Sequence, residues 1–147
     1  MIYLAASLRN PKVIDFANKL AASTGQQVFS DWFAAGPEAD DYWKKYYKER
    51  GFSYEEALKQ PASQNVFNFD KKHIDLCQFM VLLMPAGKSG HLELGYHLGK
   101  GRPGYIFLDG DPDRWDIMAL FATGVTSNFT DLAEWINHGV KHARAEI

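Results

Sequence analysis

The chain has 147 residues, enough for one domain with a buried core but short for two. Its 16 basic and 18 acidic side chains give a net charge of −2, which lacks the positive excess that binds duplex DNA or anionic membranes. We therefore expect a small-molecule partner, no nucleic acid polymer and no membrane. The single cysteine, Cys77, excludes an intrachain disulfide, and its apolar neighbours predict an inert buried thiol, which fits a reducing cytoplasm.

The first segments alternate between strand and helix patterns. Residues 1–7 are apolar, but they lack a basic flank and are too short for a signal peptide or a membrane span, so they predict a first strand. Asn10-Pro11 then opens a helix to about residue 23, whose apolar residues repeat at helical spacing, and Gly25 closes it. Residues 27–31 predict a second strand.

Residues 33–62 depart from this alternation. They contain a Gly-Pro turn, a predicted helix over 40–50 and a shorter one near 54–59. The segment predicts a helical, lid-like insertion after the second strand, over the carboxyl edge of the sheet. We expect its aromatic side chains to pack against one another rather than to stack on a base.

The rest of the chain resumes the alternation. The pattern predicts helices near 64–76, 89–100, 111–121 and 131–145, and strands at 79–84, 105–109 and 124–129. This order is typical of a single-domain α/β fold with a doubly wound, five-stranded parallel sheet. The expected strand order is 2-1-3-4-5, as in flavodoxin-like proteins.

One glutamate, Glu93, stands out in a Gly-rich segment that directly follows the apolar run 79–84. Ser89 is the predicted N-cap of this helix, so Glu93 lies in the first turns beyond a strand's carboxyl end, where open α/β sheets bind ligands. The alternative is an ordinary acid stabilised by the helix dipole. Gly95 and Gly99, four residues apart, predict close packing of this helix on the sheet. The glycine spacing matches neither a dinucleotide fingerprint nor a P-loop.

Polar residues gather at the predicted carboxyl ends of several strands or on the helices beside them. They form four groups: Tyr3, Ser7 and Arg9; Asp31 and Trp32; Asp70; and Ser89 with Glu93. Such convergence indicates a small-molecule site. The histidines His73, His91 and His97 do not form a ligand set, so we expect no metal and no cofactor.

Three segments resemble the nucleoside 2-deoxyribosyltransferase family and its relative, 2'-deoxynucleoside 5'-phosphate N-hydrolase. They are Ile2-Tyr-Leu-Ala-Ala-Ser-Leu-Arg9, Phe67-Asn-Phe-Asp-Lys-Lys-His-Ile74 and Gly90-His-Leu-Glu-Leu-Gly-Tyr96, and the resemblance runs from Met1 to about Asn128.

The resemblance implies that Glu93 attacks the anomeric carbon, releases the base and forms a glycosyl ester. It implies that Asp70 hydrogen-bonds and protonates the base, and that Tyr3 holds the nucleophilic carboxylate. The alternatives are a capping or ion-paired acid for Asp70, and an amphipathic strand-end residue for Tyr3.

The chain also departs from the family pattern. Gly87 stands where transferases have a base-contacting aspartate and the hydrolase a serine, so Lys88 or Ser89 are the nearest substitutes. Ser7-Leu8-Arg9 resembles the phosphate loop of the hydrolase. Asn128 ends a segment that resembles the one a neighbouring transferase subunit inserts into the active site, which implies a homo-oligomer.

We therefore favour an enzyme that transfers deoxyribose from a 2'-deoxynucleoside to another nucleobase. The second hypothesis is a 2'-deoxynucleoside 5'-monophosphate N-hydrolase, which the Ser7 to Arg9 loop favours. The third is a non-catalytic nucleotide-binding sensor, although binding alone does not need Glu93, Asp70 and Tyr3 together. The expected substrate-binding residues are Ser7, Arg9, Asp31, Trp32, Gly87, Lys88, Ser89 and Asn128.

Overall fold

A computed structural model describes residues 1–30 and 38–139. Within these ranges the chain forms one parallel sheet of five strands in the order β2-β1-β3-β4-β5, which confirms the predicted fold class and strand order. The strands are β1 (Ile2–Ala5), β2 (Val28–Ser30), β3 (Phe79–Met84), β4 (Gly104–Leu108) and β5 (Gly124–Thr126).

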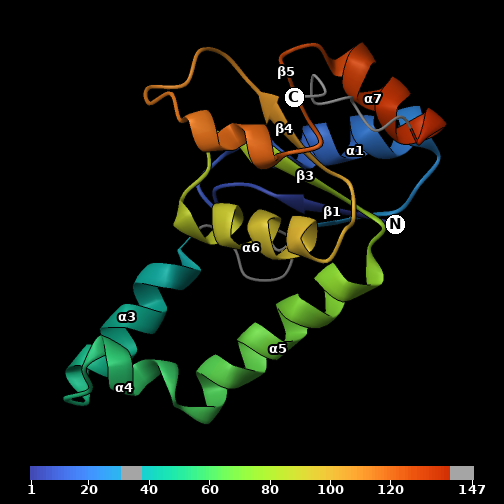
Figure 1. Cartoon of the computed structure of the whole chain (residues 1–147). Helices are drawn as coiled ribbons and strands as arrows, with labels where there is room; N and C mark the ends of the chain where they lie inside the picture. The colour runs from blue at the N-terminus through green and yellow to red at the C-terminus, as the bar shows by residue number, and fades with distance from the viewer. Residues whose placement is uncertain (31–37, 140–147) are drawn as a thin grey trace.

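Helices cover both faces of the sheet (Figure 1). One face packs against α1 (Val13–Thr24) and α7 (Phe129–His138), and the other against α5 (Pro61–Leu76) and α6 (Lys88–Gly99). Gly25 ends α1 in the left-handed region, at φ 67°, as the sequence predicts. None of the helices within 1–30 and 38–139 combines the length and apolar content needed to cross a bilayer.

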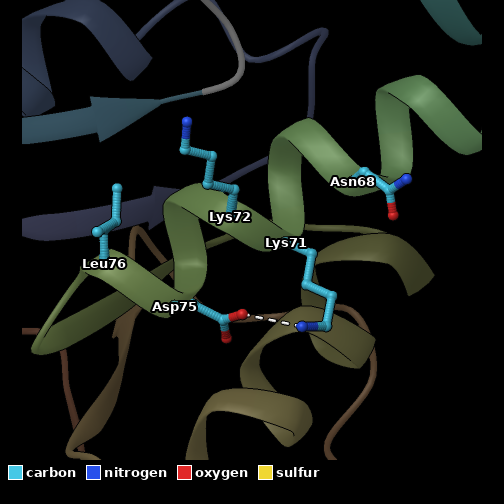
Figure 2. A pocket seen from close by; sticks show the side chains of 5 residues that line it. All are labelled: Asn68, Lys71, Lys72, Asp75 and Leu76. Carbon is cyan, nitrogen blue, oxygen red and sulfur yellow. Dashed lines mark hydrogen bonds and ion pairs between the residues drawn. The ribbon is translucent and has the colours of Figure 1, made fainter.

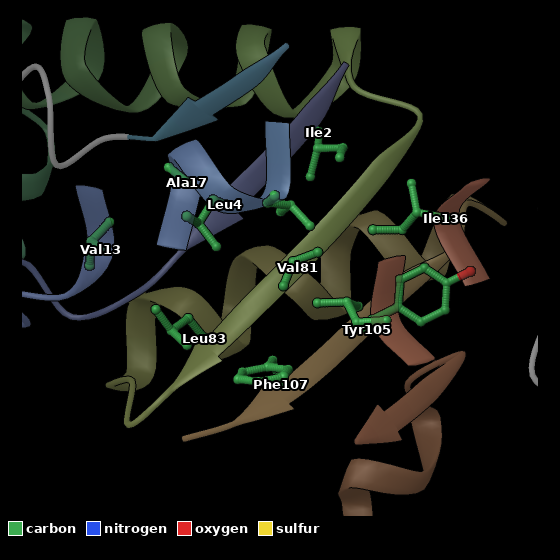
Figure 3. Close-up of a cluster of buried hydrophobic side chains, with 11 residues drawn as sticks. Ile2, Leu4, Val13, Ala17, Val81, Leu83, Tyr105, Phe107 and Ile136 are labelled. Atoms are coloured by element: carbon green, nitrogen blue, oxygen red, sulfur yellow. The ribbon is translucent and has the colours of Figure 1, made fainter. Parts of the chain in front are cut away.

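The strands are apolar throughout because the side chains on both faces of the sheet are buried. Ile2, Leu4 and Val81 point to the layer of α1 and α7, where they form the cluster drawn in Figure 3. Tyr3 and Leu82 point the other way, to the layer of α5 and α6. Burial on both faces accounts for the unbroken apolar run of β3.

The helices α3 (Ala39–Glu49) and α4 (Tyr54–Leu58), with the amino half of α5, extend away from the sheet (Figure 1). We call α3 and α4 the arm. The ring of Tyr47 lies 5.8 Å from that of Trp43 and 5.4 Å from that of Phe52, so the aromatic residues of the arm pack on one another as expected. Helix α5 begins at Pro61, and the last two residues of the predicted insertion belong to it.

The prediction of a helix over 111–121 is wrong in extent. Only Ile117–Phe121 is helical, as a short 3₁₀ segment η1, and its N-cap Asp116 accepts a hydrogen bond from the backbone N–H of Met118. Pro112 lies in the irregular part before it. The large apolar residues of this segment are exposed, so their helical spacing does not mark a buried helix face.

Two predictions about α6 are also corrected. The N-cap is Gly87, and Ser89 is an exposed residue inside the helix. Gly95 and Gly99 do not pack closely, since a Cβ built at either has nothing within 4 Å. The glycine that packs on the sheet is Gly90, because it shares the buried face of α6.

Candidate active site

Helices α5 and α6 lie side by side on one face of the sheet, and one carboxylate joins them. Asp75 Oδ1 accepts hydrogen bonds from the Tyr96 hydroxyl and from Lys100 Nζ, each at 2.7 Å. Its Oδ2 accepts from Lys71 Nζ at 2.9 Å, within α5 (Figure 2). Lys71 and Asp75 border a surface cavity of about 340 Å³ whose other walls are Asn68, Lys72 and Leu76.

The helical register of α6 places Glu93 on the side that faces α5. Glu93, Tyr96 and Lys100 follow one another at spacings of three and four residues, so they share a face. Two of them contact Asp75 of α5. The side chain of Glu93 is half-buried, and its Oε2 is shielded from solvent.

Gly90 explains why this turn of α6 lies so close to the sheet. A Cβ at Gly90 would lie 2.8 Å from Leu82 Cδ1 and 3.7 Å from Ala5 Cβ. Leu82 and Ala5 are paired positions near the carboxyl ends of β3 and β1. Glu93, one turn further along α6, is therefore held above this edge of the sheet.

Asp70 and Tyr3 belong to the same layer. Asp70 is half-buried and lies one turn before Ile74, a buried residue on the sheet side of α5. Tyr3 is fully buried in the cluster beneath α5 and α6. The fold thus gathers the three predicted catalytic residues on one face of the sheet, from three separate elements.

A cluster of stacked aromatic rings, Phe29, Phe69 and His73, lies beside this group, and the sequence did not indicate it as part of the site. The His73 ring stacks on Phe29 at 4.0 Å between centroids, and Phe69 lies 4.4 Å from His73. Phe29 also lies 5.5 Å from Tyr3. His73 is thus a packing residue, as the sequence suggested. The four-residue spacing of Phe69 and His73 on one helix could have indicated that their rings lie together.

The loop after β1 is tied to the arm. Arg9 Nη2 donates to Asp41 Oδ2 at 2.7 Å, an exposed ion pair that raises the pKa of Arg9. Ser7 Oγ accepts from the backbone N–H of Arg9 at 3.2 Å. The guanidinium that the sequence suggested for a phosphate is therefore paired with a carboxylate of the arm.

Gly87 and Lys88 line a cavity of about 930 Å³ beyond the carboxyl ends of β3 and β4, between α6 and η1. Its walls are mostly apolar, and they include Leu108 and Trp115. Tyr3, Asp70 and Glu93 are absent from these walls. The structure thus separates these two predicted substrate-binding residues from the predicted catalytic group, on different sides of α6.

The remaining predicted residues have other places. Asn128 is the N-cap of α7, where its side-chain oxygen accepts from the backbone N–H of Asp131 at 3.2 Å. Asp31 and Trp32 lie outside the described residues. Across 1–30 and 38–139 no three His, Cys, Asp or Glu side chains are grouped to hold a metal ion.

Two buried titratable groups lie near the site. Burial lowers the pKa of His97, whose Nε2 lies 2.9 Å from the carbonyl oxygen of Pro103. Burial also raises the pKa of the Cys77 thiol, as expected for an inert cysteine.

Comparison with known proteins gives a match in structure alone. No family model and no curated protein sequence matches the chain. Among solved structures, the 2-deoxyribosyltransferase from the psychrotolerant bacterium Bacillus psychrosaccharolyticus is similar, with a TM-score of 0.60 and 17% identity. The match covers 90% of this chain and 89% of that one, so the two share a fold along nearly their whole length.

Proposed function

We propose that this protein cleaves the N-glycosidic bond of a 2'-deoxynucleoside and transfers the deoxyribose to another nucleobase. The observation that carries the proposal is the position of Glu93, a shielded carboxylate on the side of α6 that faces α5. The fold shared with a 2-deoxyribosyltransferase supports the same activity. Fold alone does not fix function, so the proposal rests on the site as well.

The proposed reaction has two steps. A carboxylate oxygen of Glu93 attacks C1' of the sugar, the bond from C1' to the base nitrogen breaks, and Asp70 donates a proton to the departing base. In the second step a nitrogen of the acceptor base attacks C1' and the ester bond to Glu93 breaks. The proton on that nitrogen passes to the Asp70 carboxylate. Two displacements give net retention.

The surroundings of Glu93 suit a nucleophile. Glu93 is the sixth residue of α6, beyond the first turn where the helix dipole acts, so its half-buried place between α6 and α5 sets its environment instead. The Tyr3 hydroxyl, in the same layer, is the proposed donor that orients this carboxylate. This hydrogen bond favours the ionised carboxylate and turns its second oxygen toward the anomeric carbon.

Hydrolysis of a nucleoside monophosphate is the second candidate, with water in place of the acceptor base. Arg9, beside the carboxyl end of β1, favours it as a phosphate clamp. The pairing of Arg9 with Asp41 opposes it, because a phosphate must first displace that carboxylate. We therefore rank transfer between nucleosides first.

We also propose that the enzyme is a homo-oligomer. Large apolar side chains on and beside η1 are exposed in the single chain, and monomers rarely leave so many together in water. They are Trp115, Ile117, Met118, Leu120 and Phe121. Sedimentation velocity should give a species heavier than the 16.7 kDa chain, and a monomer at all concentrations would contradict this part.

The central experiment incubates the protein with deoxynucleosides, with and without a second free base, and identifies products by mass. Wild type should form the new nucleoside, and Glu93→Gln should lose this activity because the nucleophile is gone. Glu134→Gln, an exposed position on α7, is the matched control and should remain active. Activity retained in Glu93→Gln contradicts the mechanism. Nucleoside binding by wild type without any turnover supports the sensor hypothesis instead.

A further inference from the structure

We propose that Asp75, through Tyr96 and Lys100, is a positioning residue that fixes α6 against α5 and so sets how the carboxyl groups of Glu93 and Asp70 face each other. We call the contact of Asp75 with Tyr96 and Lys100 the clamp. This inference rests on the proposed function, since it gives those two carboxyl groups a shared purpose. The clamp itself does not touch the substrate.

The clamp uses one oxygen of the carboxylate to join two helices. Asp75 Oδ1 accepts from the Tyr96 hydroxyl and from Lys100 Nζ, both at 2.7 Å, and these donors belong to α6 and its C-cap. Oδ2 accepts only within α5, from Lys71 at 2.9 Å. The inter-helix and intra-helix contacts of this carboxylate can therefore be removed separately.

The clamp is itself anchored to the body of the protein. Arg102, in the connection before β4, donates through Nη1 to the backbone oxygen of Asp75 and, at 3.1 Å, to that of Cys77. This ties the carboxyl end of α5 to the connection that leads into β4. Hydrogen bonds from Lys100, Lys71 and the Tyr96 hydroxyl hold the pKa of Asp75 well below its usual range, so the carboxylate stays charged at neutral pH.

The positions of the clamp residues along each helix connect it to the proposed chemistry. Tyr96 follows Glu93 by three residues, about 4.5 Å along the axis, and Asp75 follows Asp70 by five, about 7.5 Å. In Figure 1 α5 slopes away from α6 toward its amino end, while the clamp joins the two near their carboxyl ends. A loss of the clamp thus lets the helices shift at the level of Glu93 and Asp70.

Such a shift matters because retaining chemistry needs its two carboxyl groups about 5 Å apart, and misplacement by about 1 Å can cost about a hundredfold in rate. The ammonium groups of Lys100 and Lys71 also lie 5.3 and 5.5 Å from the Tyr96 ring centre, and phenylalanine at this position keeps both ring contacts. The hydroxyl of Tyr96 is the directional donor of the clamp, and its removal is the sharpest test.

The test compares Tyr96→Phe with the matched control Lys71→Met. Tyr96→Phe removes one inter-helix donor, whereas Lys71→Met removes a donor to the same carboxylate within α5 and, between the helices, only a long ring contact of 5.5 Å. We expect Tyr96→Phe to lower kcat by about ten- to a hundredfold with KM within about twofold of wild type. Lys71→Met should leave both within about twofold. Asp75→Asn, which keeps an acceptor oxygen for the hydroxyl, should lose less than Asp75→Ala.

A second readout does not depend on turnover. Carboxyl ¹³C resonances of Glu93 and Asp70 should move in Tyr96→Phe and Asp75→Ala and stay in place in Lys71→Met. If Tyr96→Phe and Lys71→Met agree with wild type in these resonances, the clamp has no positioning role. If wild type shows no glycosyl transfer, the proposed function is contradicted. The carboxyl resonances still test whether the clamp positions Glu93 and Asp70. Asp75→Asn provides the same comparison if Tyr96→Phe folds poorly.

Discussion

Gly90 of α6 lies against Leu82 of β3 so closely that a Cβ on the glycine would come within 2.8 Å of Leu82 Cδ1. The neighbouring Ala5 closes the same site from β1. Gly90→Ala should therefore force the buried Leu82 side chain, or α6 with it, to shift and lower the free energy of unfolding by about 1–3 kcal/mol. Urea denaturation measures the loss, and the proposed activity should fall with it, because Glu93 moves with the helix.

Gly95→Ala is the matched control for this substitution. A Cβ at Gly95 has nothing within 4 Å, so alanine adds helix propensity without a clash. The free energy of unfolding should rise by up to about 1 kcal/mol. Equal effects at both glycines would show that the close approach at Gly90 does not limit packing.

Asp70→Asn tests the proposed proton donor. The rate should fall by about 10²–10⁴-fold for natural bases, because the amide cannot protonate the departing nitrogen. The loss should shrink for a substrate whose leaving group is stable as an anion. The measurement is kcat/KM for both substrates in both proteins. A loss of the same size for each leaving group would make Asp70 a binding residue rather than an acid.

Arg9 decides between nucleoside and monophosphate substrates. Under the transferase proposal Arg9→Ala leaves the preference for nucleosides unchanged, since the guanidinium pairs with Asp41 and not with substrate. Asp41→Ala releases Arg9 and serves as the complementary variant. The measurement is the ratio of kcat/KM for the two substrates. A monophosphate preference that grows in Asp41→Ala and collapses in Arg9→Ala would replace transfer with nucleotide hydrolysis.

His97 should make stability depend on pH. Burial lowers its pKa in the folded chain below the ordinary value of 6.5, so below that pH the unfolded chain binds a proton that the folded chain does not. Stability is therefore complete above about pH 6.5 and decreases as pH falls toward the lowered pKa. Lys100 and Arg102 lie close enough to disfavour the charged imidazole further.

The measurement is urea denaturation from pH 7.5 to 5.5. His97→Gln cannot take up a proton, and its amide can still donate to Pro103. The variant should lose much of the decrease seen in wild type over this range. An unchanged slope in His97→Gln would assign the pH dependence to other groups.

The strand order and most helices could be predicted because strands and helices alternate in the sequence and each has its own local pattern of apolar residues. The apolar run of β3 and the glycine after α1 are local signals, and both were interpreted correctly. The helix predicted over 111–121 failed since its apolar side chains face solvent in the single chain. Periodicity does not reveal whether an apolar side chain is covered by its own chain.

The candidate site likewise contains residues that the sequence could indicate and residues that it could not. Glu93 and Asp70 could be proposed from motifs, and their catalytic roles stay predictions. Asp75 could not, because its importance depends on the rotation of α5 against α6, which brings Tyr96 to 2.7 Å. Sequence spacing indicates only the pair of Lys71 and Asp75 within one helix. Contacts between helices far apart in the chain leave no such periodic signal.

The arm carries an aromatic core of its own, and its Trp43 is secured to α5 by a hydrogen bond of 2.8 Å to Ser63 Oγ. Because this small core is separate from the two clusters on the sheet, the arm can open while the sheet remains folded. Amide hydrogens of α3 and α4 should then exchange through local fluctuations long before those of β3. We expect two cooperative units, so substitutions in the arm should alter its opening without a matching loss of global stability.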